Sequence, residues 1–332
     1  MSFPRVLPVA LLAVSTVALA GCSGAAEGAG DGGGATIVAS TNVYAQIAQE
    51  LVGDGVEVAS VIDTAAQDPH AYEASARDRL LVQDAKLVIQ NGGGYDGFME
   101  ELVADDTPVI TAVEFSHDFP GAEGHEADHA DEHADDEHAD DEHADEAGHE
   151  GHDHIEGFNE HVWYDVHTMI HVVEGIAEEI GHELPDLVDA TELADNRDAL
   201  VAELEGLEGR LDALHAAHEG EGVFLTEPIG GYLAASAGLD DVTPEGFAES
   251  VEEGQDVPPA TLLDATRVIE AGDAAVILTN AQTGGAETER VIGTAEEADV
   301  PVVELSELLQ GDETYVEWMA DNVTALEGAL AG

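Results

Sequence analysis

Two histidines lie in short segments whose residue types could bind a metal ion. His70 belongs to an Asp-Pro-His segment that follows a predicted strand over residues 56–62, and His161 belongs to an Asn-Glu-His-Val-Trp segment that precedes a predicted helix. A neutral imidazole is a good ligand for transition metals. Loops at the carboxyl ends of strands are the usual place of a ligand site in α/β folds. Each histidine alone is equally compatible with an ordinary surface residue.

A further group of histidines belongs to a dense acidic run. Residues 117–154 contain 9 His and 16 Asp or Glu, without Lys or Arg, and an Asp-Glu-His-Ala-Asp unit repeats within them. The run contains few apolar side chains that could be buried in a core, so we expect a disordered surface loop. Imidazoles beside carboxylates can bind several Zn²⁺ ions loosely, and an acidic spacer with incidental histidines is the alternative interpretation. The candidate auxiliary ligands are His125, His129, His133, His138, His143, His149, His152 and His154.

The first residues are typical of a lipoprotein signal peptide. Arg5 precedes an apolar run over residues 6–20, which is too short to span a bilayer. The run is followed by Gly and Cys22, the only cysteine of the chain, in a pattern that resembles a bacterial lipobox. We expect a signal peptide over residues 1–21, lipidation of Cys22 and a flexible tether over 22–34, with a plain secretory signal as the alternative. The chain would then be extracytoplasmic and lipid-anchored to the cell membrane, on its outer face or in the periplasm.

The charge of the chain restricts its partners. Its 332 residues include 8 Lys or Arg against 73 Asp or Glu, a formal net charge of −65. Nucleic acids and anionic membrane surfaces are bound through basic side chains, so both are excluded and a metal cation is favoured. A single cysteine excludes an intramolecular disulfide framework and a Cys₄ zinc site. Hydrophobic residues make up 44% of the chain, enough for a packed core, and the acidity is typical of a salt-adapted surface.

These segments are expected on an α/β scaffold. Short apolar segments alternate with helical patterns on both sides of the acidic run, which predicts two lobes with mainly parallel central sheets. A leucine recurs every seven residues from Leu193 to Leu214, which predicts one long rigid helix over residues 191–219 between the lobes. The N-terminal α/β lobe would cover residues 35–190 and the C-terminal α/β lobe residues 220–332.

The expected elements can be located from these patterns. Strands are expected over residues 36–40, 56–62, 86–90, 109–111, 222–226, 275–279 and 301–305. Further helices are expected to begin near Asn42, Ala74, Tyr95 and Asp165, and to cover residues 229–237, 259–271, 287–298 and 314–330.

The two histidine segments resemble the Asp-Pro-His and Asn-Pro-His-x-Trp signatures of the zinc/manganese solute-binding proteins of ABC transporters (cluster A-I). The resemblance runs from Ala35 to the C-terminus and includes the histidine-rich insertion and the long helix. It implies that four side chains from both lobes hold one transition-metal ion in the cleft between the lobes. His70 and His161 match the first two ligand positions. Glu227 stands at the third position, and Asn280 stands at the fourth, where the family has a carboxylate.

This ligand set leaves the identity of the metal open. The family has His at the third position in many zinc proteins and Glu in manganese or iron proteins, and here the residue is Glu227. Two His and one Glu with a water would resemble a catalytic zinc site, whereas an amide oxygen from Asn280 would favour a harder ion such as Mn²⁺. The histidine-rich loop resembles those of zinc-specific members. We therefore expect Zn²⁺, with Mn²⁺ as the alternative.

The resemblance implies a protein that captures a divalent transition metal and delivers it to an ABC permease and its ATPase. We expect a monomer that reaches the membrane only through its lipid anchor. A secreted metallohydrolase is a competing class, because two His and a Glu can hold catalytic zinc. The sequence has no His-Glu-x-x-His motif and no Ser or Cys nucleophile motif, so we expect no enzyme. A surface lipoprotein that buffers metal or adheres, without a dedicated permease, is the remaining alternative.

Overall fold

The computed structural model describes residues 36–64, 67–120, 155 and 157–332. The expected signal peptide, Cys22, the tether and the histidines from His125 to His154 lie outside the described residues. Within the described part of the chain, no helix is both long and apolar enough to cross a membrane.

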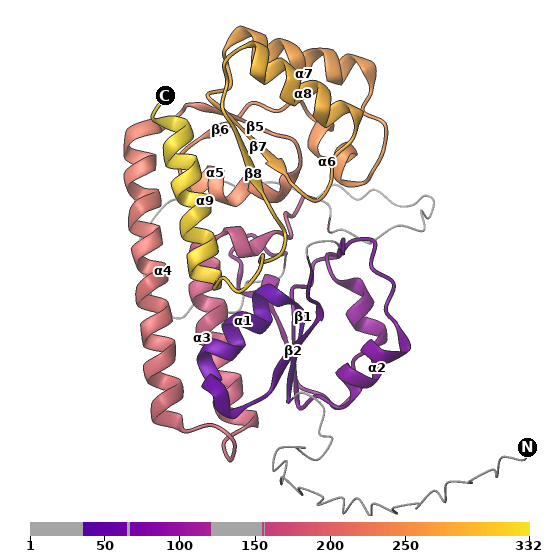
Figure 1. Cartoon of the computed structure of the whole chain (residues 1–332), viewed down its shortest axis with the longest axis vertical. Coiled ribbons are helices and arrows are strands. Elements are labelled where there is room, and N and C mark those ends of the chain that lie inside the picture. Colours follow the sequence, from indigo (N-terminus) through magenta and orange to yellow (C-terminus); the bar gives the residue numbers. More distant parts are fainter. Residues whose placement is uncertain (1–35, 65–66, 121–154, 156) are drawn as a thin grey trace, which may run out of the picture. The chain divides into compact units, whose positions relative to one another are not determined.

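The first lobe is built on a parallel sheet of four strands in the order β2-β1-β3-β4 (Figure 1). Its strands are β1 (Ile37–Thr41), β2 (Val58–Ile62), β3 (Leu87–Gln90) and β4 (Val109–Thr111). Every residue of β1 is buried, as is expected of a strand covered on both faces. The helices of this lobe are α1 (Asn42–Val52), α2 (Ala76–Gln83) and α3 (Val166–Glu183).

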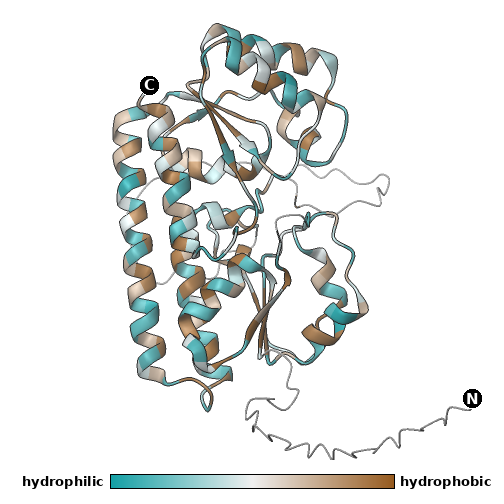
Figure 2. Ribbon diagram, viewed as in Figure 1, coloured by the Kyte–Doolittle hydropathy of each residue, from teal (hydrophilic) through white to brown (hydrophobic). Residues whose placement is uncertain are grey.

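The second lobe repeats this arrangement with the strand order β6-β5-β7-β8, again all parallel. Its strands are β5 (Gly222–Leu225), β6 (Asp240–Asp241), β7 (Val276–Asn280) and β8 (Val302–Leu305). Its helices are α5 (Gly231–Ser236), α6 (Phe247–Glu252), α7 (Pro259–Ala271) and α8 (Ala286–Glu297). In Figure 2 apolar residues concentrate along the strands, while the helices carry both polar and apolar residues.

A long helix and the C-terminal helix join the two lobes. The helix α4 (Ala190–His218) contacts α1 and α3 of the first lobe as well as α5 of the second, and it packs along α9 (Tyr315–Leu330) (Figure 1). One continuous hydrophobic cluster includes β1, the leucines of α4 and residues of β5 and β7. The lobes therefore share a core, which fits a rigid connection.

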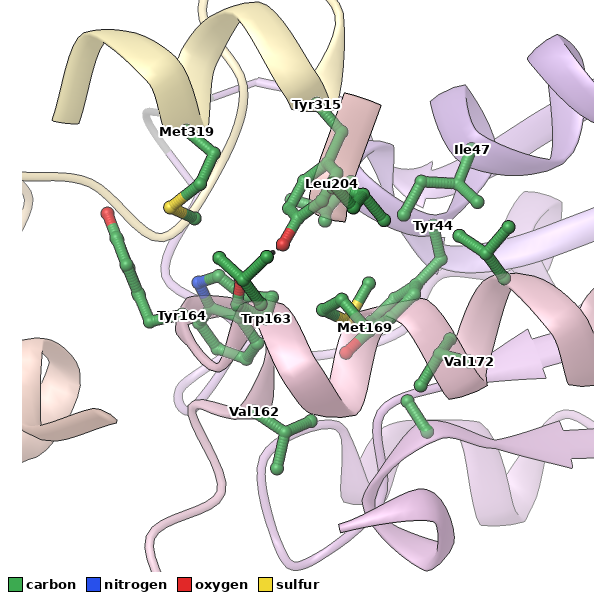
Figure 3. Close-up of a cluster of buried hydrophobic side chains, with 14 of the residues drawn as sticks. Tyr44, Ile47, Val162, Trp163, Tyr164, Met169, Val172, Leu204, Tyr315 and Met319 are labelled. Carbon is green, nitrogen blue, oxygen red and sulfur yellow. Dashed lines mark hydrogen bonds between the residues drawn. The ribbon is translucent and has the colours of Figure 1, made fainter. Parts of the chain in front are cut away.

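A group of aromatic side chains closes this core beside the second histidine segment. Trp163 and Tyr164 lie in a short 3₁₀ helix η4 (Val162–Tyr164), and both are buried. The hydroxyl of Tyr315, at the start of α9, donates a hydrogen bond of 2.7 Å to the carbonyl oxygen of Trp163 (Figure 3). This bond ties the C-terminal helix to the segment that carries His161.

Each strand expected from the sequence is present, with boundaries that differ by up to two residues. The helix expected near Tyr95 is instead a short 3₁₀ helix η2 (Gly97–Glu101). The chain turns sharply before it, because Gly92, Gly93 and Gly94 all have positive φ and the carboxylate of Asp96 accepts hydrogen bonds from the backbone of Asn91 and Gly92. The short elements β6 and α6 were not expected.

Candidate metal centre

His70 lies in a turn beyond the carboxyl end of β2. Its backbone N–H donates to the carboxylate of Asp68 at 3.0 Å, which fixes the turn. The imidazole is largely buried and meets the ring of Tyr95 edge-on, with 5.0 Å between ring centroids. The ring nitrogen Nε2 lies 4.0 Å from Oε2 of Glu307, a residue of the second lobe. This contact brings the loops of the two lobes together.

His161 is held in a defined orientation by Asn159. The distance between His161 Nδ1 and Asn159 Oδ1 is 2.8 Å, and because an amide oxygen only accepts, Nδ1 carries the proton. The nitrogen Nε2 is therefore the atom that can bind a metal. Asn159 is itself tied to the second lobe, since its side-chain amide donates to the carbonyl oxygen of Pro228 and its backbone carbonyl oxygen accepts from the hydroxyl of Tyr232. The His161 ring is 1% exposed.

His70, His161 and Glu307 form a possible metal-binding set. Each offers one ligand atom, and these atoms all lie within 4.8 Å of one another. Glu307 follows β8, separated from it by Ser306. Two atoms bound to one Zn²⁺ at about 2.0 Å each are at most about 4 Å apart, so a small inward movement would bring the three ligands onto one ion. The set is drawn from both lobes, as the resemblance implies.

Glu227 and Asn280 lie against this set in a hydrogen-bonded chain. The amide Nδ2 of Asn280 donates to Glu227 at 2.9 Å and to Glu307 at 2.7 Å. Oδ1 of Asn280 points the other way and accepts from the backbone N–H of Gln282 at 3.0 Å. The orientation follows from charge, because an amide oxygen placed between two carboxylates would be repelled. Glu227 also accepts from the hydroxyl of Thr283.

The buried carboxylates of the centre hold their protons unusually tightly. Burial, together with the charges of Asp68 and Glu227, raises the pKa of Glu307 to about 8. The pKa of Glu227 is also raised, chiefly by burial. Burial and the charge of Glu160 are the leading causes that raise the pKa of Glu252 to about 9. Such shifts are typical of sites in which a cation normally compensates the negative charge.

Three acidic residues at the centre were not expected from the sequence, namely Glu160, Glu252 and Glu307. Glu307 could have been found from its place, because it follows a predicted strand of the second lobe as closely as Glu227 does. Glu160 stands directly before His161 in the segment already singled out. Glu252 is the last residue of α6, a helix too short to show a hydrophobic period in the sequence. No sequence signal places Glu252 at the centre.

The remaining described histidines lie away from the centre. His167 and His171 stand one turn apart on α3, are exposed, and pair with Glu208 and Glu174 respectively. His182 and His218 likewise contact neighbouring acidic side chains at the surface. Their environments are those of ordinary surface residues.

Comparison with known proteins identifies the family. A family model described as zinc-uptake complex component A, periplasmic (ZnuA), matches residues 37–329, nearly the whole described chain. The chain belongs to the ZnuA family. This is a family of solute-binding components and not of enzymes.

Individual relatives are distant. The zinc-binding lipoprotein AdcA of Streptococcus pneumoniae is 25% identical over 292 residues, which cover 85% of this chain and 53% of AdcA, so the chain spans about half the length of that relative. The manganese-binding lipoprotein MntA of Halalkalibacterium halodurans is 23% identical over 326 residues, or 97% of each chain. The solved structure of the periplasmic zinc-binding protein TroA of Treponema pallidum has a TM-score of 0.66 at 17% identity and covers 90% of this chain and 99% of TroA. The last comparison confirms the two-lobed α/β fold.

Proposed function

We propose that this protein is an extracytoplasmic binding protein that captures a divalent transition-metal ion and delivers it to an ABC permease. The observation that carries the proposal is the buried set of His70, His161 and Glu307, which two lobes contribute and whose ligand atoms lie within 4.8 Å of one another. Membership of the ZnuA family and the similarity to zinc- and manganese-binding lipoproteins support it. The ion is cargo, and the proposal assigns no catalysis to the chain.

The same observations suggest how the ion is held. His70, His161 and Glu307 would bind it directly, and Glu227 would supply a fourth ligand from the same hydrogen-bonded group. Asn280, which the sequence suggested as a ligand, would hold the two carboxylates in place through its amide nitrogen. Two imidazoles and two carboxylates suit the tetrahedral coordination of Zn²⁺, whereas Mn²⁺ prefers more oxygen ligands. We therefore propose Zn²⁺ as the cargo, with Mn²⁺ as the alternative.

The decisive experiment is a metal-binding titration of the metal-stripped mature protein with Zn²⁺ and Mn²⁺ in competition. We expect one tight Zn²⁺ site that His161→Ala weakens by orders of magnitude, because the ring supplies a buried ligand. His171→Ala is the matched control, since it removes an exposed histidine from α3 and should leave tight binding unchanged. Unchanged tight binding in His161→Ala would contradict the proposed site, and preferential binding of Mn²⁺ would overturn the choice of cargo.

The histidine-rich run would gather ions at lower affinity. The support is compositional, with 9 His among 38 residues over 117–154. Deleting Gly121–Gly151 should remove the weak binding events from the titration and leave the tight one. Loss of the tight event in this deletion would show that the run, and not the interlobe set, holds the captured ion.

Partner and location follow from the same interpretation. We propose that the chain docks as a monomer on a permease driven by a cytoplasmic ATPase, and that a lipid on Cys22 keeps it at the membrane. Cells fed a labelled fatty acid should label the protein, and Cys22→Ser should abolish the label. Label that persists in Cys22→Ser would contradict lipidation at this position.

A further inference from the structure

The peptide unit that leads into His161 is held at both of its polar ends. Its N–H, which belongs to His161, donates to the side-chain oxygen of Asn159 at 3.1 Å. Its carbonyl oxygen, which belongs to Glu160, accepts a hydrogen bond of 3.0 Å from Nδ2 of Asn91. Asn91 follows β3 directly and stands 69 residues before Glu160 in the chain. The first bond is local, whereas the second ties this peptide unit to the sheet of the first lobe.

The side-chain amide of Asn91 is fixed in one orientation. Its oxygen accepts a hydrogen bond from the hydroxyl of Tyr44 on α1, and its nitrogen also donates to the carbonyl oxygen of Gly92 at 2.9 Å. A half-turn of the amide would place its oxygen against the carbonyl oxygens of Gly92 and Glu160, and all three atoms can only accept. Asn91 is 0% exposed, so water cannot take over these bonds. The amide must therefore present its nitrogen to Glu160.

The turn that carries Asn91 is itself held in place and lies directly against Glu160. The buried carboxylate of Asp96 accepts hydrogen bonds from two consecutive backbone N–H groups of the turn, at 2.6 and 2.8 Å. Gly93 makes the close approach possible, because a methyl group in its place would lie 3.3 Å from Cβ of Glu160. The position of the first-lobe sheet is therefore passed through the turn to the peptide unit in front of the metal-binding histidine.

We propose that Asn91 is a positioning residue of the metal centre, which acts on the captured ion through the backbone that carries His161. This inference rests on the proposed function, in which His161 binds the ion. Groups that orient the ligands of a metal typically contribute about 10–100-fold to its affinity. Asn91 holds the backbone and not the ring of the ligand, so we expect a contribution at the lower end, about tenfold. A residue that only stabilised the fold would leave the metal affinity of the folded protein unchanged.

The test compares two variants of the full-length mature protein. Asn91→Ala removes the bonds to Tyr44 and to Glu160 together, whereas the matched control Tyr44→Phe removes only the first and keeps the second. Both should lower the melting temperature of the metal-free protein, because each leaves a buried polar group without its partner. Only Asn91→Ala should weaken tight Zn²⁺ binding, by about tenfold. X-ray absorption at the zinc edge should show weaker imidazole scattering in Asn91→Ala and an unchanged spectrum in Tyr44→Phe.

The outcomes separate this inference from the proposed function. Asn91→Ala with the zinc affinity and spectrum of the unmodified protein would overturn the positioning role. An equal loss of affinity in Tyr44→Phe would overturn it too, because the loss would then follow from general destabilisation. Tight binding that survives His161→Ala would instead overturn the proposed function, whatever the Asn91 variant does. If Asn91→Ala does not fold, Asn91→Ser keeps a hydroxyl in the buried turn and serves for the same measurements.

Discussion

At the scale of single residues, the amide of Asn280 explains how two buried carboxylates lie side by side in the metal-free protein. It donates one N–H to Glu227 and the other to Glu307, and its oxygen is turned away to the backbone of Gln282. Each of these bonds ends on a carboxyl oxygen, and such a bond becomes stronger when the acid is ionised. Asn280 thus acts on the metal through the two acids and positions them.

Replacing Asn280 by Asp tests this role. The substitution keeps the shape of the side chain but places a third carboxylate between Glu227 and Glu307 and removes both donors. A buried polar group that loses its partner costs about 1–3 kcal/mol, and more when it is charged. We expect Asn280→Asp to lower the melting temperature of the metal-free protein clearly, and saturating Zn²⁺ to recover most of the loss. A metal-free variant as stable as the unmodified protein would show that the amide does not support the acids.

The sequence could predict only part of this site. His70 and His161 stand in distinctive segments, and Glu227 follows a buried strand directly, so pattern and spacing point to them. Glu307 follows β8 as closely as Glu227 follows β5, but it is one acid among 73 and stands in no distinctive segment, so its position alone is a weaker signal. The orientation of an amide is also invisible in sequence, since Asn280 can present either its oxygen or its nitrogen to its neighbours.

At the scale of elements, the helix α4 stabilises both lobes through one stripe of leucines. Leu193, Leu200, Leu204, Leu207, Leu211 and Leu214 are all buried. Leu204, which is fully buried, lies in the aromatic and aliphatic cluster shown in Figure 3. The stripe faces α1, α3 and α9 at different points along its length, so the helix resists relative movement of the elements that it joins.

A cavity substitution in this stripe should be costly. Leu204→Ala removes three side-chain carbon atoms at a fully buried site, and such changes destabilise proteins by about 2–5 kcal/mol. The matched control is Leu263→Ala in α7, where the leucine is 50% exposed and the loss should be small. Urea unfolding of the metal-free variants measures both. Equal losses in the two variants would contradict the role of the stripe in the shared core.

Glu50 of α1 makes the stability of the folded protein depend on pH. Burial raises its pKa above the ordinary value of 4.5, and the charges of Glu203 on α4 and Glu317 on α9 raise it further. At low pH the folded and unfolded chains both hold the proton. As the pH rises through the raised pKa, the folded protein must carry a half-buried charge and loses stability, and this loss persists at neutral pH.

Glu50→Gln should therefore stabilise the protein at pH 7, and the advantage should shrink as the pH falls below about 4.5. Thermal unfolding of the two proteins across this range measures the difference. Glu205→Gln, which removes an exposed charge from α4, should show a smaller change at pH 7. An advantage that does not depend on pH would mean that the carboxylate charge of Glu50 is not its cause.

The larger elements could be predicted because each has a strong local pattern. Buried strands such as β1 and β7 are short apolar runs, and the leucine period defines α4 over nearly the whole of its length. The two-residue strand β6 consists of Asp240 and Asp241, which have low strand propensity, and it forms because β5 offers backbone partners. The helix α6 has six residues, too few for a period to show. These elements depend on tertiary contacts that the local sequence does not contain.

At the scale of the whole molecule, the net charge of −65 has two parts, one in the histidine-rich run proposed to gather ions and one spread over the rest of the chain. The run over residues 117–154 contributes 16 of the 73 acidic residues, and the others are distributed along the remainder of the chain. A field of this sign attracts divalent cations toward the protein and raises their encounter rate at low ionic strength. The same charge repels itself in the folded state, so cation capture and folding stability respond to salt in opposite directions.

This opposition leads to a prediction on the metal-free full-length protein. The Debye length falls from about 30 Å at 0.01 M salt to about 10 Å at 0.1 M, so repulsion between surface carboxylates weakens strongly over this range. We expect the melting temperature, measured in the presence of a chelator, to rise steeply between these concentrations and equally in NaCl and KCl, because screening depends on ionic strength and not on the ion. In the same range the rate of Zn²⁺ capture should fall. A melting temperature that stays constant would show that surface repulsion does not limit the stability of the fold. A rise in only one of the two salts would point to specific ion binding instead of screening.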